Sequence, residues 1–281
     1  MRGKNRALRG ALTAGLITRW LGQKLARAGS ETGIGTSAQW RARWERQNHR
    51  GETVTLFEGP AIAAGLVTGA LVAGATPRTK ISSALAVSGA GVFGVIDDLA
   101  EQTEEKGLRG HVGALARGKL TTGGLKILGI GAASLAAAAL ARERSDSVRD
   151  VLSKGALIAA SANLANLFDL RPGRVLKAST AAGLPLALIS TESGLAGAVV
   201  GSSLAAAPED LGEETMAGDG GANALGALVG STVAFSAPRV VRETALLGVI
   251  ALTAASERWS FSKFIDNTPW LRAVDVWGRR R

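Results

Sequence analysis

The chain has 281 residues, and its 33 Lys and Arg against 23 Asp and Glu give a net charge of +10. Because it contains no cysteine, a disulfide scaffold and a thiolate metal site are excluded, and its two histidines lie far apart, which disfavours a zinc site. The positive charge indicates an anionic partner, which is a nucleic acid, a phosphorylated substrate or an anionic membrane surface.

Residues 1–56 are basic and contain one short apolar run, 10–18. This run is compatible with a short or tilted membrane span, with a helix in the membrane interface, and with a signal peptide.

Eight later windows contain no Asp, Glu, Lys or Arg and consist mainly of Ala, Gly, Leu and Val. They are 59–77, 81–96, 127–141, 155–168, 178–191, 193–208, 220–238 and 244–256. They lack the charged face of a soluble amphipathic helix, and their Gly and Ser allow close packing of transmembrane helices. Flanking Lys and Arg extend them toward the roughly 20 residues that span a bilayer. We therefore expect an all-α, polytopic integral membrane helix bundle of 8–9 transmembrane helices. A soluble helical protein, which the mean hydropathy of +0.17 favours, is the alternative.

The aromatic and basic residues give this bundle an orientation. All six Trp lie outside the windows, beside Arg and Lys, as is typical of residues at a membrane interface. If every window crosses the membrane once, the side of residues 20–56 collects 20 Lys and Arg, with Lys126 counted beside segment 97–125, and the loops on the opposite side hold seven. Arg2, Lys4, Arg6 and Arg9 join the opposite side if the run 10–18 also crosses, which the sequence leaves open. The basic side is then cytoplasmic. It contains segments 20–56, 97–125, 169–177, 209–219 and 257–281.

We divide the chain into a transmembrane domain, 1–256, and a basic aromatic cytoplasmic tail, 257–281. The tail interleaves Trp and Phe with Arg and Lys, and Pro269 breaks it into two short pieces. This pattern favours an amphipathic element on an anionic inner leaflet. Single-stranded nucleic acid is the disfavoured alternative, and we expect no nucleic acid polymer as a partner.

Acidic side chains mark the cytoplasmic ends of three windows. Asp97 and Asp98 end the second window, where adjacent carboxylates need a cation or a raised pKa to relieve their repulsion. Asp219 precedes the seventh window within a Gly-rich turn. The alternatives are a water boundary for the aspartate pair and a helix N-cap for Asp219.

Asp169 ends the fourth window, and the i, i+3, i+6 spacing predicts that it shares a helix stripe with Asn163 and Asn166. The two amides are alternatively interhelical hydrogen-bonding groups. Oxygen ligands that converge near basic loops suit Mg²⁺ and phosphate groups.

Four motifs in this order resemble those of the polyprenyl-phosphate N-acetylhexosamine-1-phosphate transferases, glycosyltransferase family 4. They are GVIDD at 94–98, KGLRGH at 106–111, NLANLFD at 163–169 and GDGG at 218–221. Residues 48–55 resemble the first cytoplasmic loop of that family, and the resemblance covers roughly residues 10–256.

The resemblance implies a Mg²⁺-dependent glycosyl-1-phosphate transferase in a bacterial cell (inner) membrane, with its active face cytoplasmic. Such an enzyme transfers a sugar 1-phosphate from a nucleotide sugar to a polyprenyl phosphate, releases a nucleoside monophosphate, and serves cell-envelope polymer synthesis. The catalytic residues implied are Asp97, Asp98 and Asp169, and the metal ligands are Asp97, Asp98 and Asp219. The implied substrate-binding residues are Asn163, Asn166, Lys106, Arg109, His111 and Lys126.

The sequence also departs from the family pattern. Pro172 replaces the second carboxylate of the usual Asp-Gly-x-Asp-Gly, Met216 replaces an aromatic residue, and the histidine-rich last loop is absent. These changes affect recognition of the base and speak against a uridine diphosphate sugar as donor. The alternatives are a catalytically degenerate relative that binds polyprenyl phosphate or scaffolds envelope assembly, and a small transporter. Whether the chain is a monomer or a homodimer stays open.

Overall fold

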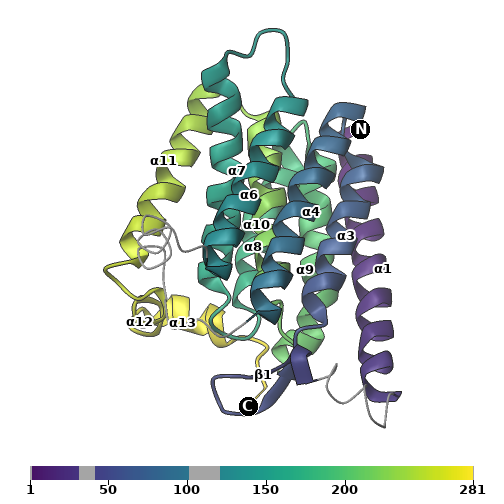
Figure 1. Ribbon diagram of the computed structural model, residues 1–281, viewed down its shortest axis with the longest axis vertical. Helices are drawn as coiled ribbons and strands as arrows, with labels where there is room; N and C mark the ends of the chain where they lie inside the picture. The colour runs from purple at the N-terminus through teal and green to yellow at the C-terminus, as the bar shows by residue number, and fades with distance from the viewer. Residues whose placement is uncertain (1, 32–41, 101–120, 281) are drawn as a thin grey trace.

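The computed structural model of the protein describes residues 2–31, 42–100 and 121–280. Within these residues, nine helices of at least 16 residues form one up-and-down bundle (Figure 1). They are α1 (Arg2–Glu31), α3 (Glu58–Ala73), α4 (Pro77–Leu99), α6 (Thr122–Leu140), α7 (Val148–Phe168), α8 (Arg174–Ile189), α9 (Ser193–Leu211), α10 (Gly218–Ser236) and α11 (Arg239–Ser256). A hairpin of β1 (Glu45–Gln47) and β2 (Thr53–Thr55) and two short helices, α12 (Phe261–Asp266) and α13 (Pro269–Val276), complete the fold.

The prediction of an all-α fold is confirmed, and each of the eight charge-free windows lies mainly within one helix, α3 to α11. Polar residues set several of the helix starts. The hydroxyls of Thr76 and Ser147 close capping boxes at the starts of α4 and α7, and Thr121 caps α6. Several helices begin before their windows, because charged residues there are also helical, as in α4, α7 and α11.

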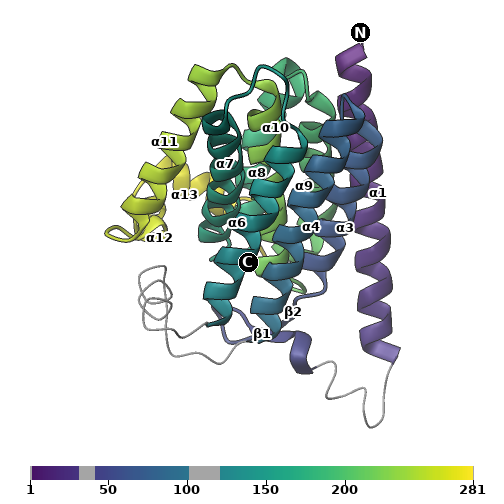
Figure 2. The ribbon, with the colours of Figure 1, turned by 45° about the horizontal axis from the view of Figure 1, so that its top comes forward.

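The run 10–18 lies in the middle of α1, a helix of 30 residues. Such a helix is about 45 Å long, which exceeds the apolar thickness of a bilayer. It packs against α3 and α9 (Figures 1 and 2), so the run 10–18 is part of one long helix of the bundle and not a separate short helix.

Glycine allows α1 and α9 to pack with almost no space between their backbones. A Cβ atom added at Gly197 would lie 2.0 Å from the carbonyl oxygen of Ala7, and one at Gly201 would lie 2.0 Å from that of Ala11. These glycines are four residues apart on one face of α9, the small-residue spacing found between transmembrane helices.

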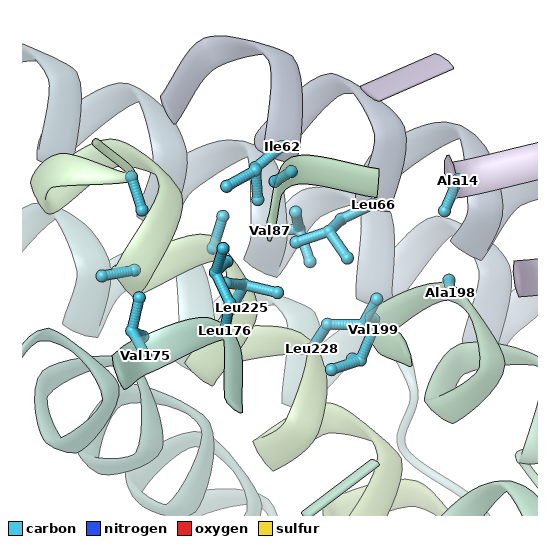
Figure 3. Close-up of a cluster of buried hydrophobic side chains, with 14 of the residues drawn as sticks. Ala14, Ile62, Leu66, Val87, Val175, Leu176, Ala198, Val199, Leu225 and Leu228 are labelled. Carbon is cyan, nitrogen blue, oxygen red and sulfur yellow. The ribbon is translucent and has the colours of Figure 1, made fainter. Parts of the chain in front are cut away.

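Helix α10 is the centre of the bundle. It packs against α3, α4, α7, α8 and α9, and most of its residues are buried. Leu225 and Leu228 of α10 meet Ile62 and Leu66 of α3 in the main core cluster, together with Val199 of α9 (Figure 3).

The outer surface of the bundle is apolar. Among the described residues, three helices, α4, α6 and α7, are long and apolar enough to cross a membrane. On α1, exposed apolar residues recur every four positions and form one stripe: Leu8, Leu12, Leu16 and Trp20. Water-soluble helices bury such a stripe, whereas a membrane protein presents it to lipid.

One end of the bundle, here called the site end, gathers the described parts of the segments that the sequence predicts on one side. Helices α1, α4, α7, α9 and α11 finish there, and α3, α6, α8 and α10 begin there (Figures 1 and 2). The hairpin, which the sequence analysis did not predict, also lies at this end. Its strand β2 pairs with the loop before α10, where the backbone N–H of Met216 donates to the carbonyl of Thr55 at 2.9 Å.

Candidate functional site

An ion-paired cluster lies at the site end, where α4 finishes and α6 and α10 begin. The Lys126 ammonium lies 2.7 Å from a carboxylate oxygen of Asp97 and also pairs with Asp219. All three side chains are mostly buried. One cation therefore offsets the repulsion between two carboxylates from different helices.

Asp98, the neighbour of Asp97, is used differently. Its two carboxylate oxygens accept hydrogen bonds from the backbone N–H groups of Asp219 and Gly220, each at 3.0 Å. Helix α10 has Ala217 at its N-cap and no side-chain cap of its own. Asp98 supplies that cap from α4 through these two hydrogen bonds. The prediction that Asp219 is itself the N-cap is wrong, because Asp219 lies inside the first turn.

The glycines of the two motifs make this contact possible. A Cβ atom added at Gly94 would lie 2.4 Å from the carbonyl oxygen of Asp219. Gly218 has a φ of +57°, a left-handed conformation that favours glycine. The motifs GVIDD and GDGG therefore fit against each other at the crossing of α4 and α10.

Asp169, which ends α7, lies beside this cluster. Burial raises the pKa of the Asp169 carboxyl well above its usual range, and the carboxylates of Asp210, Asp219 and Asp98 raise it further, against a hydrogen bond from the backbone of Gly218. The four aspartates named by the sequence analysis thus lie at one end of the bundle, near one another.

A cavity of about 220 Å³, here called the loop cavity, opens beside Asp169. It is bounded by the hairpin loop with Asn48 and His49, by the turn that contains Pro172, and by Met216. Burial lowers the pKa of His49 below its usual 6.5, and Arg171 lowers it further, against Glu213, which raises it. The imidazole is therefore mainly neutral at pH 7 and can both donate and accept a hydrogen bond.

A second cavity of about 450 Å³, here called the groove, lies between α6, α7, α10 and α11. Its walls are mainly Ala and Ile, and the polar side chains that line it are those of Lys126, Asn163, Asn223, Thr253 and Glu257. The groove therefore presents an apolar surface that includes the cation of the ion-paired cluster.

The predicted stripe of Asn163, Asn166 and Asp169 is divided between these two spaces. Asn163 lines the groove and Asp169 lines the loop cavity. Asn166, which lies between them in the sequence, is half-buried. Lys106, Arg109 and His111 lie outside the described residues.

Sequence reasoning missed two contributors to the site. The guanidinium of Arg46, in β1, donates to the carbonyl oxygen of Asp98 and so attaches the hairpin to the end of α4. The carboxylate of Asp210, at the end of α9, accepts from the backbone N–H of Gly173 at 2.5 Å and lines the loop cavity. Both residues are charged and lie in segments that the sequence analysis assigns to the same side of the bundle as the aspartates. That assignment was the sequence signal that could have pointed to them.

Asp97, Asp98 and Asp219 carry carboxylate oxygens, which are the type of ligand that Mg²⁺ prefers. In the part of the chain that the structure describes, no group of three or more His, Asp or Glu side chains is arranged to hold a metal ion. The point where Asp97 and Asp219 converge is taken by the Lys126 ammonium. A divalent ion there would compete with that ammonium for the same two carboxylates.

Searches against models of protein families and against curated proteins found no match to this chain.

Proposed function

We propose that the chain is a polytopic membrane enzyme that transfers a sugar 1-phosphate from a nucleotide sugar to a polyprenyl phosphate. The observation that carries this proposal is the meeting of Asp97, Asp219 and Lys126 at the end of the groove-bearing helices, with Asp98 fixed at the start of α10. Carboxylates and fixed cations of this kind serve reactions between two anionic phosphates, which need their charge offset.

In this proposal α3 to α11 cross the membrane eight times, and α1 adds a ninth crossing. The exposed apolar stripe on α1 and the apolar character of α4, α6 and α7 support it. The excess of Lys and Arg at the site end favours a cytoplasmic position for that end, in the inner membrane of a bacterium.

The two cavities suit the two substrates. The groove has the apolar walls that a prenyl chain requires, and Lys126 would pair with the phosphate at the head of that chain. The loop cavity has charged side chains among its lining residues, including Asp169, Arg171 and Asp210, and a volume of about 220 Å³ accommodates only part of a nucleotide sugar. Because Pro172 and Met216 line it, the base would be held without the usual carboxylate and aromatic ring.

In the reaction, an oxygen of the polyprenyl phosphate attacks the phosphorus next to the sugar. A new P–O bond forms, the bond to the bridging oxygen breaks, and that oxygen leaves with the nucleoside monophosphate. Lys126 would offset negative charge on the phosphates, and Asp98 would keep the start of α10 fixed against α4. Bound Mg²⁺ would add further charge neutralisation, with Asp97 and Asp219 as its carboxylate ligands.

The test is release of a nucleoside monophosphate by the purified protein in nanodiscs that contain polyprenyl phosphate, Mg²⁺ and one nucleotide sugar at a time. We expect release with one member of a panel that varies base and sugar, and loss of release in Asp97→Asn. Asp266→Asn, an exposed carboxylate of α12, is the matched control and should retain activity. Absence of release across the whole panel would contradict the proposal.

A non-catalytic relative that only binds polyprenyl phosphate is the second candidate. Pro172 favours it, because its carbonyl accepts from the Arg279 guanidinium at 3.0 Å, so the C-terminal tail contacts the segment where the family has its second carboxylate. Saturable binding of polyprenyl phosphate without any release would identify this function.

A further inference from the structure

Helix α13 has its polar side turned toward the protein. The buried carboxylate of Asp275 forms a two-point ion pair with Arg174 at the start of α8, at 2.8 and 3.0 Å. Arg279 lies 2.6 Å from the same carboxylate. The Lys177 ammonium donates to three carbonyl oxygens of the tail, those of Val274, Asp275 and Trp277. The inner face of α13 is therefore held by charges and hydrogen bonds.

The outer face of α13 is apolar and exposed. Trp270, Val274 and Trp277 follow an i, i+4, i+7 spacing, and their exposed fractions are 68%, 54% and 75%. Phe264 on α12 and Trp259 before it are exposed to a similar extent. A short helix surrounded by water has the opposite arrangement, with its apolar side against the protein.

The tail lies at the depth where the apolar bundle ends. The ring of Phe261 in α12 stacks on Phe168, the last residue of α7, with the ring centroids 5.2 Å apart. Figure 1 shows α12 below the lower end of α11 and α13 next to α12, toward the site end. At this depth a membrane changes from acyl chains to headgroups, which is where Trp side chains are most stable.

The charge of the tail supports the same surroundings. Arg258, Lys263 and Arg272 are exposed and alternate with the aromatic residues along the sequence. Basic side chains near a membrane surface are attracted to anionic lipid headgroups. A second protein copy would have to supply both an apolar and an acidic surface, whereas an anionic leaflet supplies both together.

We propose that α12 and α13 form an interfacial platform on the anionic leaflet at the site end. Trp259, Phe264, Trp270 and Trp277 enter the boundary between headgroups and acyl chains, and Arg258, Lys263 and Arg272 contact lipid phosphates. The pair Arg174–Asp275 fixes the platform to the bundle. This inference depends on the membrane location and is independent of the transferase activity.

The absence of cysteine allows a direct test on the full chain. One nitroxide label is placed by Val274→Cys and, in a separate protein, by Ser145→Cys in the exposed loop between α6 and α7. Both proteins are reconstituted in nanodiscs of equal parts phosphatidylglycerol and phosphatidylcholine. Electron paramagnetic resonance then compares access of oxygen with access of a water-soluble nickel complex. We expect position 274 to favour oxygen by about threefold or more over position 145.

The charge contribution is measured with spin-labelled lipids. The variant Arg258→Gln/Lys263→Gln/Arg272→Gln should lower the preference of the protein for phosphatidylglycerol over phosphatidylcholine by at least about twofold. Equal nickel access at positions 274 and 145 would overturn the proposal. Dipolar coupling between labels at position 274 of two copies, unchanged by lipid composition, would overturn it in favour of a dimer surface.

Discussion

The carboxylate of Asp98 accepts a hydrogen bond from the backbone N–H of Asp219 at 3.0 Å, although the two residues are 121 positions apart. The end of α4 thereby caps the start of α10, which has no cap from its own sequence. Since α10 is the central helix, this one contact links the core of the bundle to the candidate site.

Asp98→Ala should destabilise the protein. It removes both acceptors from the N–H groups of Asp219 and Gly220, and loss of a helix cap costs about 1–2 kcal/mol. Thermal unfolding in detergent measures the effect. Asp266→Ala, on the exposed surface of α12, should change the unfolding temperature little. Equal effects of the two substitutions would show that the cap contributes nothing.

Lys126→Met should make the protein more responsive to Mg²⁺. Without the ammonium, the carboxylates of Asp97 and Asp219 face each other with no cation, which destabilises the fold by roughly 3 kcal/mol. A divalent ion then has no competitor for those oxygens. We expect a lower unfolding temperature without Mg²⁺ and a larger rise on its addition than in the unsubstituted protein. Lys126→Arg retains a cation and is the matched control, and a rise equal to that of the unsubstituted protein would contradict competition.

Gly94→Ala should disturb the contact between α4 and α10. The added methyl group would lie 2.4 Å from the carbonyl oxygen of Asp219, and such overpacking costs about 1–3 kcal/mol. Gly131→Ala is the control, because no atom lies within 4 Å of its added Cβ and alanine favours helix. Thermal unfolding should therefore move in opposite directions for the two variants.

The helices of this bundle were predictable because charge is absent from their middles. The windows follow from the positions of the charged residues along the sequence, and the common end of Asp97, Asp169 and Asp219 follows from counting one crossing per window. The hairpin was not predictable, since its strands have three residues each and depend on pairing with the distant loop at Met216. Short strands of this kind carry little local signal.

The site was predictable in its residue types and less so in their roles. The sequence places Asp97 and Asp98 side by side, yet one pairs with Lys126 and the other caps α10. These two different roles depend on how the end of α4 and the start of α10 are oriented, and the packing of the helices determines that orientation. Arg46 reaches the end of α4 for the same reason, through a hairpin that sequence pattern did not reveal.

Acid should loosen the C-terminal tail. Burial raises the pKa of the Asp275 carboxyl, but the hydrogen bond and charge of Arg174 and the charge of Arg279 outweigh it and hold that pKa below its usual value. A depressed pKa stabilises the folded state above the unfolded value of about 3.9, and this contribution is lost as the pH falls below that value. A nitroxide at Val274→Cys should therefore become mobile as the pH falls from about 4 through the lower pKa of the folded state, as seen in its paramagnetic resonance line shape. In Asp275→Asn, no carboxylate remains to titrate, so the label should be mobile at every pH. A label that stays immobile in both proteins down to pH 3 would show that the Arg174–Asp275 ion pair does not hold the tail.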